Sequence, residues 1–200
     1  MSYELLTALV GFALVGSITP GPNNMMLMAS GANFGFRLTI PHMFGIGAGF
    51  MVMIFLVGIG LIGVFDAWPP AHTLLTMISV AYLLWLAWKI ANAAAPETGQ
   101  TAGKPLSFLQ AAMFQWVNPK AWTMSLTAIT LYAPDRSLLA ITLVALAFGL
   151  VNLPSTSTWT ILGQQLRRLL SSPARLRAFN WTMAALLVAS LIPVVYPSGS

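Results

Sequence analysis

Residues 5–28 read LLTALVGFALVGSITPGPNNMMLM, an apolar run that contains the sequence TPGPNN at 19–24. A stretch of about 18 or more apolar residues with few charges is typical of a membrane-spanning helix. Pro20 and Pro22 remove two backbone donors and Gly21 adds conformational freedom, so a helix is not expected to continue through this stretch unbroken. These residues therefore predict a spanning segment that is interrupted inside the membrane.

A second interruption occurs about halfway along the apolar run at 107–131. Asn118-Pro119-Lys120 lies there between two tryptophans, so a proline and a cationic side chain share one helical turn. Freed backbone groups at membrane depth persist only where protein or a watery cavity satisfies them. A charged side chain at that depth costs free energy, so it is interpreted by default as part of a functional site. The two breaks together predict a polar site within the membrane.

The composition of the whole chain indicates a membrane protein. Of its 200 residues, 58% are hydrophobic and 6% are charged, and the mean hydropathy is +0.81. A typical soluble domain is about 45–50% apolar and about 25% charged. Nine Lys and Arg and four Asp and Glu could not cover the surface of a water-soluble globule of this size. The same figures exclude a disordered chain.

Six apolar segments qualify as membrane spans: 5–28, 40–64, 72–92, 107–131, 137–162 and 178–196. The expected fold class is therefore an all-α integral membrane protein of six transmembrane helices, the first and fourth of them broken. We expect the first segment to be a span rather than a secretory signal peptide, because the preceding MSYE holds Glu4 and no Lys or Arg. Residues 1–196 are expected to form a single transmembrane domain, and residues 197–200 a flexible tail.

The basic residues predict the orientation of the chain, because cytoplasmic loops carry an excess of Lys and Arg. The first, third and fifth loops carry most of them: Arg37, Lys89, Lys104, Arg167, Arg168, Arg175 and Arg177. The other loops and the termini contain only Arg136, so both termini are expected outside the cell. This bias explains the net charge of +5 better than nucleic-acid binding does, since no dense basic run is interleaved with aromatic side chains.

The two breaks fall at corresponding positions of the chain. The first and fourth spans each open a group of three, and three spans reverse the side of the membrane. Halves of about 1–100 and 101–196 are therefore expected to form two inverted three-helix repeats. Paired segments interrupted by Pro or Gly at corresponding positions are the best indication in a sequence of a transporter binding site.

The residues at the breaks offer the chemistry that a small zwitterion such as an amino acid needs. Helix N-termini after Pro22 and Pro119 present free N–H groups and a positive dipole end to a carboxylate. Lys120 adds a charge or a site for a proton, and Thr19, Ser17 and the amide carbonyls could receive an ammonium group. The candidate substrate-binding residues are Thr19, Pro20, Gly21, Pro22, Asn23, Asn24, Asn118, Pro119, Lys120 and Asn152.

The fifth span contains a further polar stretch, in which Asn152 is followed by PSTST at 154–158. Hydroxyl side chains within a helix often bond back to their own backbone. The alternative is that they line the same cavity as the two breaks, since polar groups inside a membrane cluster along transport paths. Both alternatives stay open at this point.

The residues that are missing also discriminate between functions. The chain has no Walker-type phosphate loop, HExxH or GxSxG motif and no cysteine, so no catalytic residue, metal site or cofactor is expected and the chain is not expected to be an enzyme. Glu4, Asp66, Glu97 and Asp135 all map to segment ends or loops. Any proton coupling is therefore assigned to Lys120 or the substrate, with His42 a weaker candidate that we expect at a helix end, facing the membrane interface.

The sequence resembles the lysine exporter (LysE/RhtB) family of bacterial amino-acid exporters over essentially its whole length. The resemblance rests on TPGPNN at 19–24, on Gly35-Phe36-Arg37, and on FQWVNPK at 114–120. AYLLWLAWKIA at 81–91 and KPLSF at 104–108 are most similar to the branch that exports cysteine and O-acetylserine.

This resemblance implies a LysE-type translocator domain that exports an amino acid through the bacterial inner membrane, surrounded by lipid and driven by a proton or other ion gradient. A homo-oligomer is left open. The alternative is a passive channel for ions or small solutes, which would need rings of polar groups along a continuous pore.

Overall fold

The computed structural model describes residues 1–61, 63–68, 70–93, 104–167, 169–170 and 172–192. Within these ranges the chain is helical and has no strand, which confirms the all-α prediction. The helices are α1 (Tyr3–Ile18), α2 (Pro22–Phe34), α3 (Phe36–Leu56), α4 (Gly63–Ala67), α5 (Pro70–Ala91), α6 (Phe108–Phe114), α7 (Pro119–Tyr132), α8 (Leu138–Leu166) and α9 (Pro173–Ala189). A π-helical turn at Val57–Leu61 extends α3, and a 3-10 turn at Gln115–Val117 follows α6. The predicted tail at 197–200 and the positions of Glu97 and Arg168 lie outside the described residues.

Several helices are long and apolar enough to cross a membrane, as expected of a multi-pass membrane protein. They are Phe36–Leu61, Pro70–Ala91 and Leu138–Leu166, and the bent pair Tyr3–Ile18 and Pro22–Phe34 makes one more if it is a single span. The fourth and sixth predicted spans do not reach that length. The break at Asn118 leaves pieces of 7 and 14 residues, and α9 has 17 residues. The count of six spans therefore stays a prediction.

The chain breaks at TPGPNN, as predicted. α1 ends at Ile18 and α2 begins at Pro22, and the two helices are bent by 55°. Gly21 is extended, with φ of −173°, because the residue before a proline is disfavoured in the helical region. Pro22 then takes the first position of α2, where a missing N–H is tolerated.

The second predicted break is also confirmed, at Asn118. This residue has φ of −94° and ψ of 106°, and its side chain accepts a hydrogen bond from the backbone N–H of Lys120. Pro119 opens α7 in the same way that Pro22 opens α2. By contrast, α8 continues through Pro154 without a break, so a proline in an apolar run is not by itself sufficient to end a helix here.

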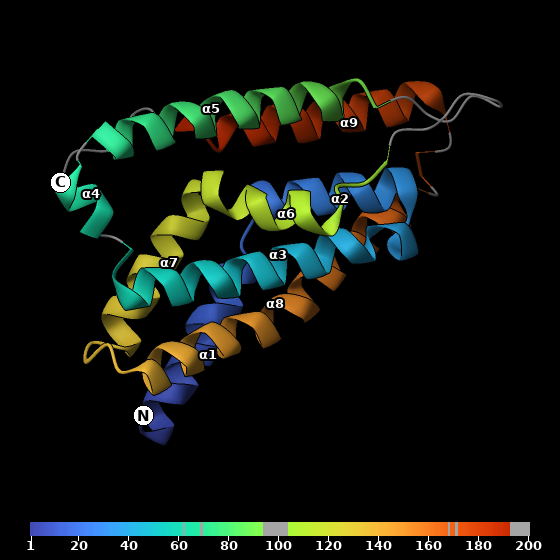
Figure 1. The fold of residues 1–200 in the computed structure, drawn as a ribbon. Helices are drawn as coiled ribbons and strands as arrows, with labels where there is room; N and C mark the ends of the chain where they lie inside the picture. Colours follow the sequence, from blue (N-terminus) through green and yellow to red (C-terminus); the bar gives the residue numbers. More distant parts are fainter. Residues whose placement is uncertain (62, 69, 94–103, 168, 171, 193–200) are drawn as a thin grey trace.

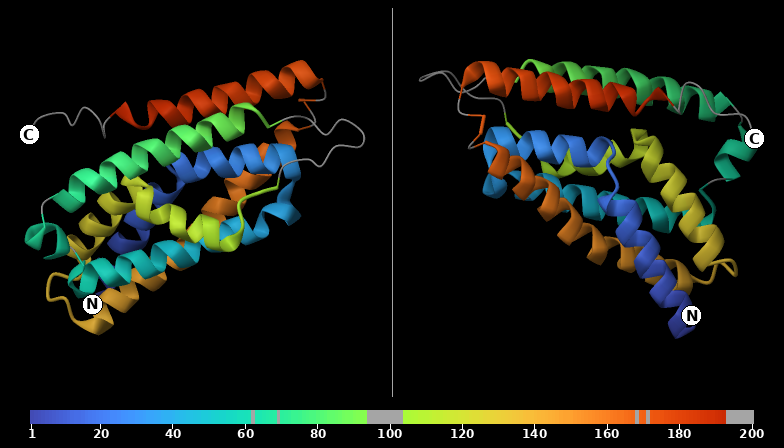
Figure 2. Two further views of the ribbon diagram at one scale, coloured as in Figure 1. Left: turned by 45° about the horizontal axis from the view of Figure 1, so that its top comes forward. Right: turned by 180° about the vertical axis from the view of Figure 1, so that it is seen from behind.

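The helices form a bundle with a separate outer layer. α5 and α9 lie side by side and run antiparallel on one side of the other helices (Figures 1 and 2). α8 packs against α1, α2 and α3. The segments α1–α2, α3, α5, α6–α7, α8 and α9 run in alternating directions, so α2, α5 and α8 end at one end of the molecule and α3 and α7 end at the other (Figure 1).

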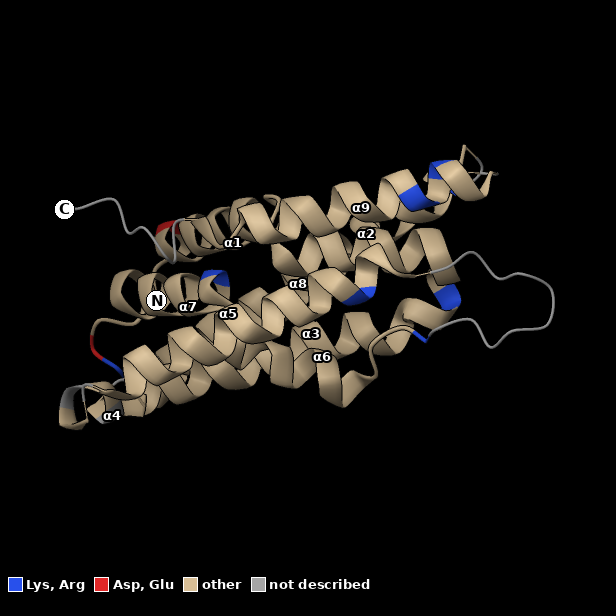
Figure 3. Cartoon of the chain, turned by 90° about the horizontal axis from the view of Figure 1, so that it is seen from above, with Lys and Arg blue, Asp and Glu red and all other residues tan. Residues whose placement is uncertain are grey.

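The basic residues gather at one end of this bundle. Figure 3 shows Lys and Arg where α3 and α9 begin and α5 ends. Arg37 lies in the first turn of α3, Lys89 in the last turn of α5, and Arg175 near the start of α9. Asp135 and Arg136 lie at the other end, in the turn between α7 and α8. The charge asymmetry that the sequence predicted is therefore present along the long axis of the bundle.

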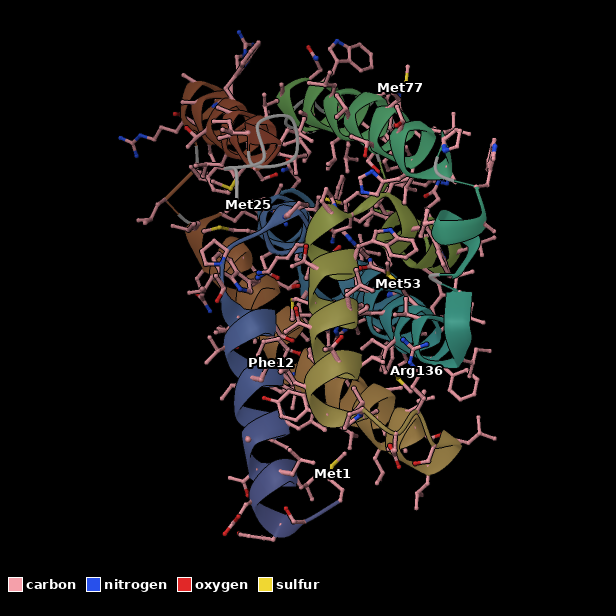
Figure 4. The ribbon with its side chains drawn as sticks, turned by 90° about the vertical axis from the view of Figure 1, so that its left-hand side faces the viewer. Met1, Phe12, Met25, Met53, Met77 and Arg136 are labelled. Atoms are coloured by element: carbon pink, nitrogen blue, oxygen red, sulfur yellow. The ribbon has the colours of Figure 1, made fainter. Side chains whose placement is uncertain are left out.

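Aromatic side chains pack α1, α7 and α8 together. The ring of Phe12 on α1 turns toward α7 (Figure 4), and its centre lies 5.8 Å from that of Tyr132 and 6.0 Å from that of Phe148. Met53 is fully buried among these helices, whereas Met77 on α5 is 65% exposed and points away from the bundle (Figure 4). Exposed apolar side chains of this kind suit a surface that faces lipid.

Candidate functional site

A small polar cavity lies where the two helix breaks meet. Its volume is about 30 Å³, which leaves room for about two water molecules. Its polar lining comes from both breaks and from α8: Ser17, Asn23, Asn24, Gln115, Asn118, Lys120, Asn152 and Thr156. Small or apolar residues complete it: Gly16, Gly21, Ile46, Phe50, Ala121 and Met124.

A reciprocal pair of amides joins the two breaks across this cavity. Asn23 Nδ2 donates to Gln115 Oε1 at 2.9 Å, and Gln115 Nε2 donates back to Asn23 Oδ1 at 3.2 Å. Gln115 is fully buried, and its Nε2 also donates to the carbonyl of Ala111 at 2.9 Å. These bonds connect the start of α2 to the end of α6. Separating the two helices would leave buried amides without partners, which costs free energy.

The last carbonyls of α1 are satisfied by side chains, since the break leaves them without partners within the helix. Asn24 Nδ2 donates to the carbonyls of Ser17 and Thr19 at 2.9 and 2.8 Å. Ser155 Oγ donates to the carbonyl of Ser17 at 2.8 Å. Trp159 Nε1 donates to the carbonyl of Ile18 at 3.1 Å. α2 and α8 thus supply the donors that stabilise the broken end of α1.

Lys120 projects from the first turn of α7 onto the same broken end. Its Nζ donates to the carbonyl of Thr19 at 2.5 Å, where the partial negative charge of the α1 C-terminus favours a cation. Gly21 makes room for this side chain, because a methyl group at Gly21 would lie 2.8 Å from Lys120 Cδ. No Asp or Glu occurs in the helices around this side chain, α2, α3, α6, α7 and α8. The ammonium group of Lys120 is therefore stabilised by carbonyl dipoles rather than by a carboxylate.

The structure brings six of the predicted site residues to the lining of one cavity: Gly21, Asn23, Asn24, Asn118, Lys120 and Asn152. Thr19 contributes its carbonyl from the rim, and Pro20 is exposed. Pro22 and Pro119 set the start of α2 and α7 and are not part of the lining.

The structure combines the two alternatives for the fifth span. Thr158 and Thr160 donate to backbone carbonyls of their own helix, at 2.8 Å each. Asn152 and Thr156 line the cavity, and Ser155 bonds to α1. One face of α8 therefore serves the site, and Thr156 on that face also donates to the carbonyl of Leu153 in its own helix at 3.0 Å.

Gln115 is a polar residue of the site that the sequence prediction missed, beside the small and apolar lining residues. It lies three positions before Asn118 in the motif FQWVNPK, so a second amide close to the break was the available signal. Its role depends on meeting Asn23, which is 92 residues away in the chain.

Two polar atoms at the cavity have no hydrogen-bond partner among the described residues: Ser17 Oγ and Asn152 Oδ1. Both belong to lining residues. A buried polar group without a partner indicates a place where water or a ligand is received. The site thus offers an ammonium group, several amide donors and free oxygen acceptors, which suits a small molecule that carries both charges. Within the described part of the chain no three His, Cys, Asp or Glu residues gather as metal ligands.

A bundle of apolar helices with a polar site at two helix breaks defines a multi-pass membrane protein of the transport class. The model of the LysE type translocator family matches residues 14–193. The chain is 32% identical over 200 residues to the cysteine/O-acetylserine efflux proteins of Escherichia coli (strain K12) and Shigella sonnei (strain Ss046), with 98% of this chain and 100% of each relative covered. No solved structure matches it. The chain therefore belongs to the LysE family, and the resemblance seen in its motifs is confirmed.

Proposed function

We propose that this chain is a secondary exporter of amino acids or small amino-acid derivatives in a bacterial inner membrane. The observation that carries the proposal is the meeting of two helix breaks around one polar cavity lined by Asn23, Gln115 and Lys120. Membership of the LysE family supports it. Because relatives at 32% identity are cysteine/O-acetylserine efflux proteins, these two compounds are the first substrates to test.

The proposed architecture is one translocator domain at 1–196 with six spans, arranged as inverted halves of about 1–100 and 101–196. Each half then opens with a broken helix, α1–α2 in the first and α6–α7 in the second. The alternating helix directions support this arrangement, as does the antiparallel pairing of α5 with α9, the last helix of each half (Figure 1). The gathering of Lys and Arg at one end (Figure 3) supports a cytoplasmic position for that end and an outside position for both termini.

In the proposed complex, the substrate carboxylate binds Lys120 Nζ and the N–H groups at the start of α2. The first N–H groups of α7 are already engaged, because those of Lys120 and Ala121 donate to the side chain and the carbonyl of Asn118. The carbonyl of Thr19 now accepts from Lys120 Nζ, so the carboxylate would replace this carbonyl as the partner of the ammonium group. Thr19 keeps a second donor, Asn24 Nδ2 at 2.8 Å, when Lys120 turns away. The free acceptors Ser17 Oγ and Asn152 Oδ1 are then available to the substrate ammonium.

The small size of the cavity supports alternating access rather than a passive channel. A volume of about 30 Å³ has room for about two water molecules and is too small for an amino acid. The helices around the breaks must therefore part to admit a substrate. Movement of one half against the other around a fixed site is the usual way in which inverted repeats accomplish this.

The proposal is tested by counterflow in proteoliposomes. Purified protein is reconstituted with an unlabelled amino acid inside, and uptake of labelled cysteine, O-acetylserine and a panel of neutral and cationic amino acids is measured. We expect saturable counterflow with cysteine, O-acetylserine or another neutral amino acid. Flux that neither saturates nor shows counterflow would indicate a channel, and recovery of a chemically altered substrate would indicate an enzyme.

A further inference from the structure

A histidine lies buried in α3, outside the lining of the cavity. His42 is 1% exposed, and neither of its ring nitrogens has a hydrogen-bond partner among the described residues. The expectation that it lies exposed at a helix end is wrong, because α3 begins at Phe36 and buries the following turns against α2 and α8. A fully buried imidazole without partners is uncommon, since buried polar groups are normally hydrogen-bonded.

The position of His42 relates it directly to the site. Ile46 and Phe50 are the residues of α3 that line the cavity, and they follow His42 by one and two helical turns on the same face. The four residues from His42 to Ile46 correspond to a rise of about 6 Å along the helix axis. On the other side of His42 lies the start of α3 with Arg37, at the end of the molecule where basic residues gather (Figure 3). His42 therefore stands between the cavity and that end.

No charged group is paired with His42. The elements packed against α3 are α2, α6, α7, α8 and the turns at Gln115–Val117 and Val57–Leu61. Among these, the titratable side chains are Lys120 and Tyr132, both on α7, and α3 itself carries Arg37. None of these elements carries a carboxylate.

The nearest polar contact along this face of α3 is already satisfied. Ser30 Oγ and Thr39 Oγ1 are 2.8 Å apart, and Thr39 Oγ1 donates its own hydrogen to the carbonyl of Gly35 at 2.8 Å. Ser30 is therefore the donor of the pair, and no free hydroxyl hydrogen is left there for His42. The protonation state of the His42 ring is therefore not fixed by a hydrogen-bond partner among the described residues.

We infer that His42 is the residue that carries a proton through the transport cycle and couples export to a proton gradient. This inference rests on the proposed function. Imidazole is the side chain that ordinarily changes its charge near neutral pH, and a charged ring without a partner in this packing would be strongly unfavourable. The conformation described here therefore holds the neutral ring, and binding of a proton favours a conformation in which water reaches it.

The proton balance of the cycle is simple. A proton from water on the outer side binds to a ring nitrogen of His42 and forms one N–H bond. The same bond breaks when the proton is released to water on the cytoplasmic side, while the substrate moves outward. The charged and the neutral ring of His42 then stabilise different conformations of the protein. This difference is the condition for a proton gradient to drive substrate export.

The test compares two transport modes of the same protein. Proteoliposomes with an acidic lumen are given labelled cysteine, or the panel amino acid that exchanges fastest, and accumulation is measured beside counterflow at equal pH. We expect the wild-type protein to show both modes and His42→Gln to lose accumulation while counterflow continues. His72→Gln is the matched control, because the second histidine of the chain is exposed on α5 and packs beside Phe65. It should keep both modes.

The outcomes separate this inference from the proposed function. Gradient-driven accumulation by His42→Gln at the wild-type level would overturn the role of His42, as would a wild-type protein that exchanges substrate without responding to the gradient. Absence of wild-type counterflow would instead overturn the proposed function on which the inference depends. If His42→Gln fails to fold, the His72→Gln protein labelled with ¹⁵N-histidine reports on His42 alone by NMR. Its ring should change protonation over the pH range of transport, and a ring that stays neutral throughout would overturn the inference.

Discussion

Lys120 Nζ donates a hydrogen bond of 2.5 Å to the carbonyl of Thr19, a residue 101 positions earlier in the chain. Thr19 caps the end of α1 and Lys120 lies in the first turn of α7, so this bond joins the two helix breaks. The main-chain carbonyl occupies the position on the ammonium group that a substrate carboxylate would take. In the proposed complex, the bond to the α1 end and the bond to an anion are therefore alternatives for one side chain, so binding of the anion releases the end of α1.

Replacement of Lys120 by alanine is expected to lower the rate of counterflow at least about tenfold. A hydrogen bond to a charged group contributes about 1.5–3 kcal/mol, and each 1.4 kcal/mol is about a factor of ten. Lys89→Ala is the matched control, since Lys89 is exposed on α5 with its Nζ 5.3 Å from the ring centre of Trp85. Initial rates at subsaturating substrate measure the effect, and equal rates for Lys120→Ala and the wild-type protein would remove Lys120 from the site.

The amide pair of Asn23 and Gln115 is expected to show non-additive effects on stability. Alanine at either position leaves the other amide short of a partner, at about 1–3 kcal/mol. Alanine at both positions removes both groups, so the double variant should lose less than the sum of the single losses. Thermal unfolding in detergent measures this, with Asn92→Ala as the control because its exposed side chain bonds, among the residues that the structure describes, to the nearby carbonyl of Trp88 alone. Additive losses would show that the two amides act independently.

Two glycines set the close contact between α2 and α8. A methyl group at Gly31 would overlap the carbonyl of Thr160, and one at Gly163 would overlap the carbonyl of Met28. Since backbone cannot move aside as a flexible side chain does, Gly31→Ala and Gly163→Ala should each destabilise the protein by about 1–3 kcal/mol. The control is Gly11→Ala, because a methyl group at Gly11 on α1 meets nothing within 4 Å. Unfolding temperatures of both variants at the control level would contradict this packing.

The sequence was sufficient to locate the breaks because their cause is local. Pro22 and Pro119 disfavour helical backbone at the residues before them, Gly21 and Asn118. A glycine and a helix-capping asparagine at these positions favour the break further, whereas α8 continues through Pro154, which follows a leucine. The all-helical class follows from composition in the same way, since lipid requires that backbone groups be paired within a segment. The count of six spans does not follow in this way, because apolar length alone does not indicate where a helix such as α9 ends.

The contacts across the site were not predictable, because they depend on tertiary packing. That Asn23 meets Gln115 follows from the approach of α2 to α6, and no periodicity within either segment indicates it. Lys120 was expected to offer its charge to a carboxylate or to hold a proton, and the sequence did not indicate that its Nζ donates to the carbonyl of Thr19 at the end of α1. His42 was expected at a helix end because the start of its helix was placed at residue 40, whereas α3 begins at Phe36 and buries His42 within the helix.

Asn118 is expected to have two roles that one pair of substitutions separates. Its side chain accepts from the backbone N–H of Lys120 at 3.2 Å and caps α7, and it is 2% exposed at the cavity. Asn118→Ala should lose about 1 kcal/mol of stability together with counterflow, because alanine is a poor N-cap. Asn118→Ser restores a capping oxygen but not the amide, so it should recover the unfolding temperature while counterflow stays low. Recovery of both by serine would limit Asn118 to capping, whereas recovery of neither would mean that the amide is required for the packing of the break itself.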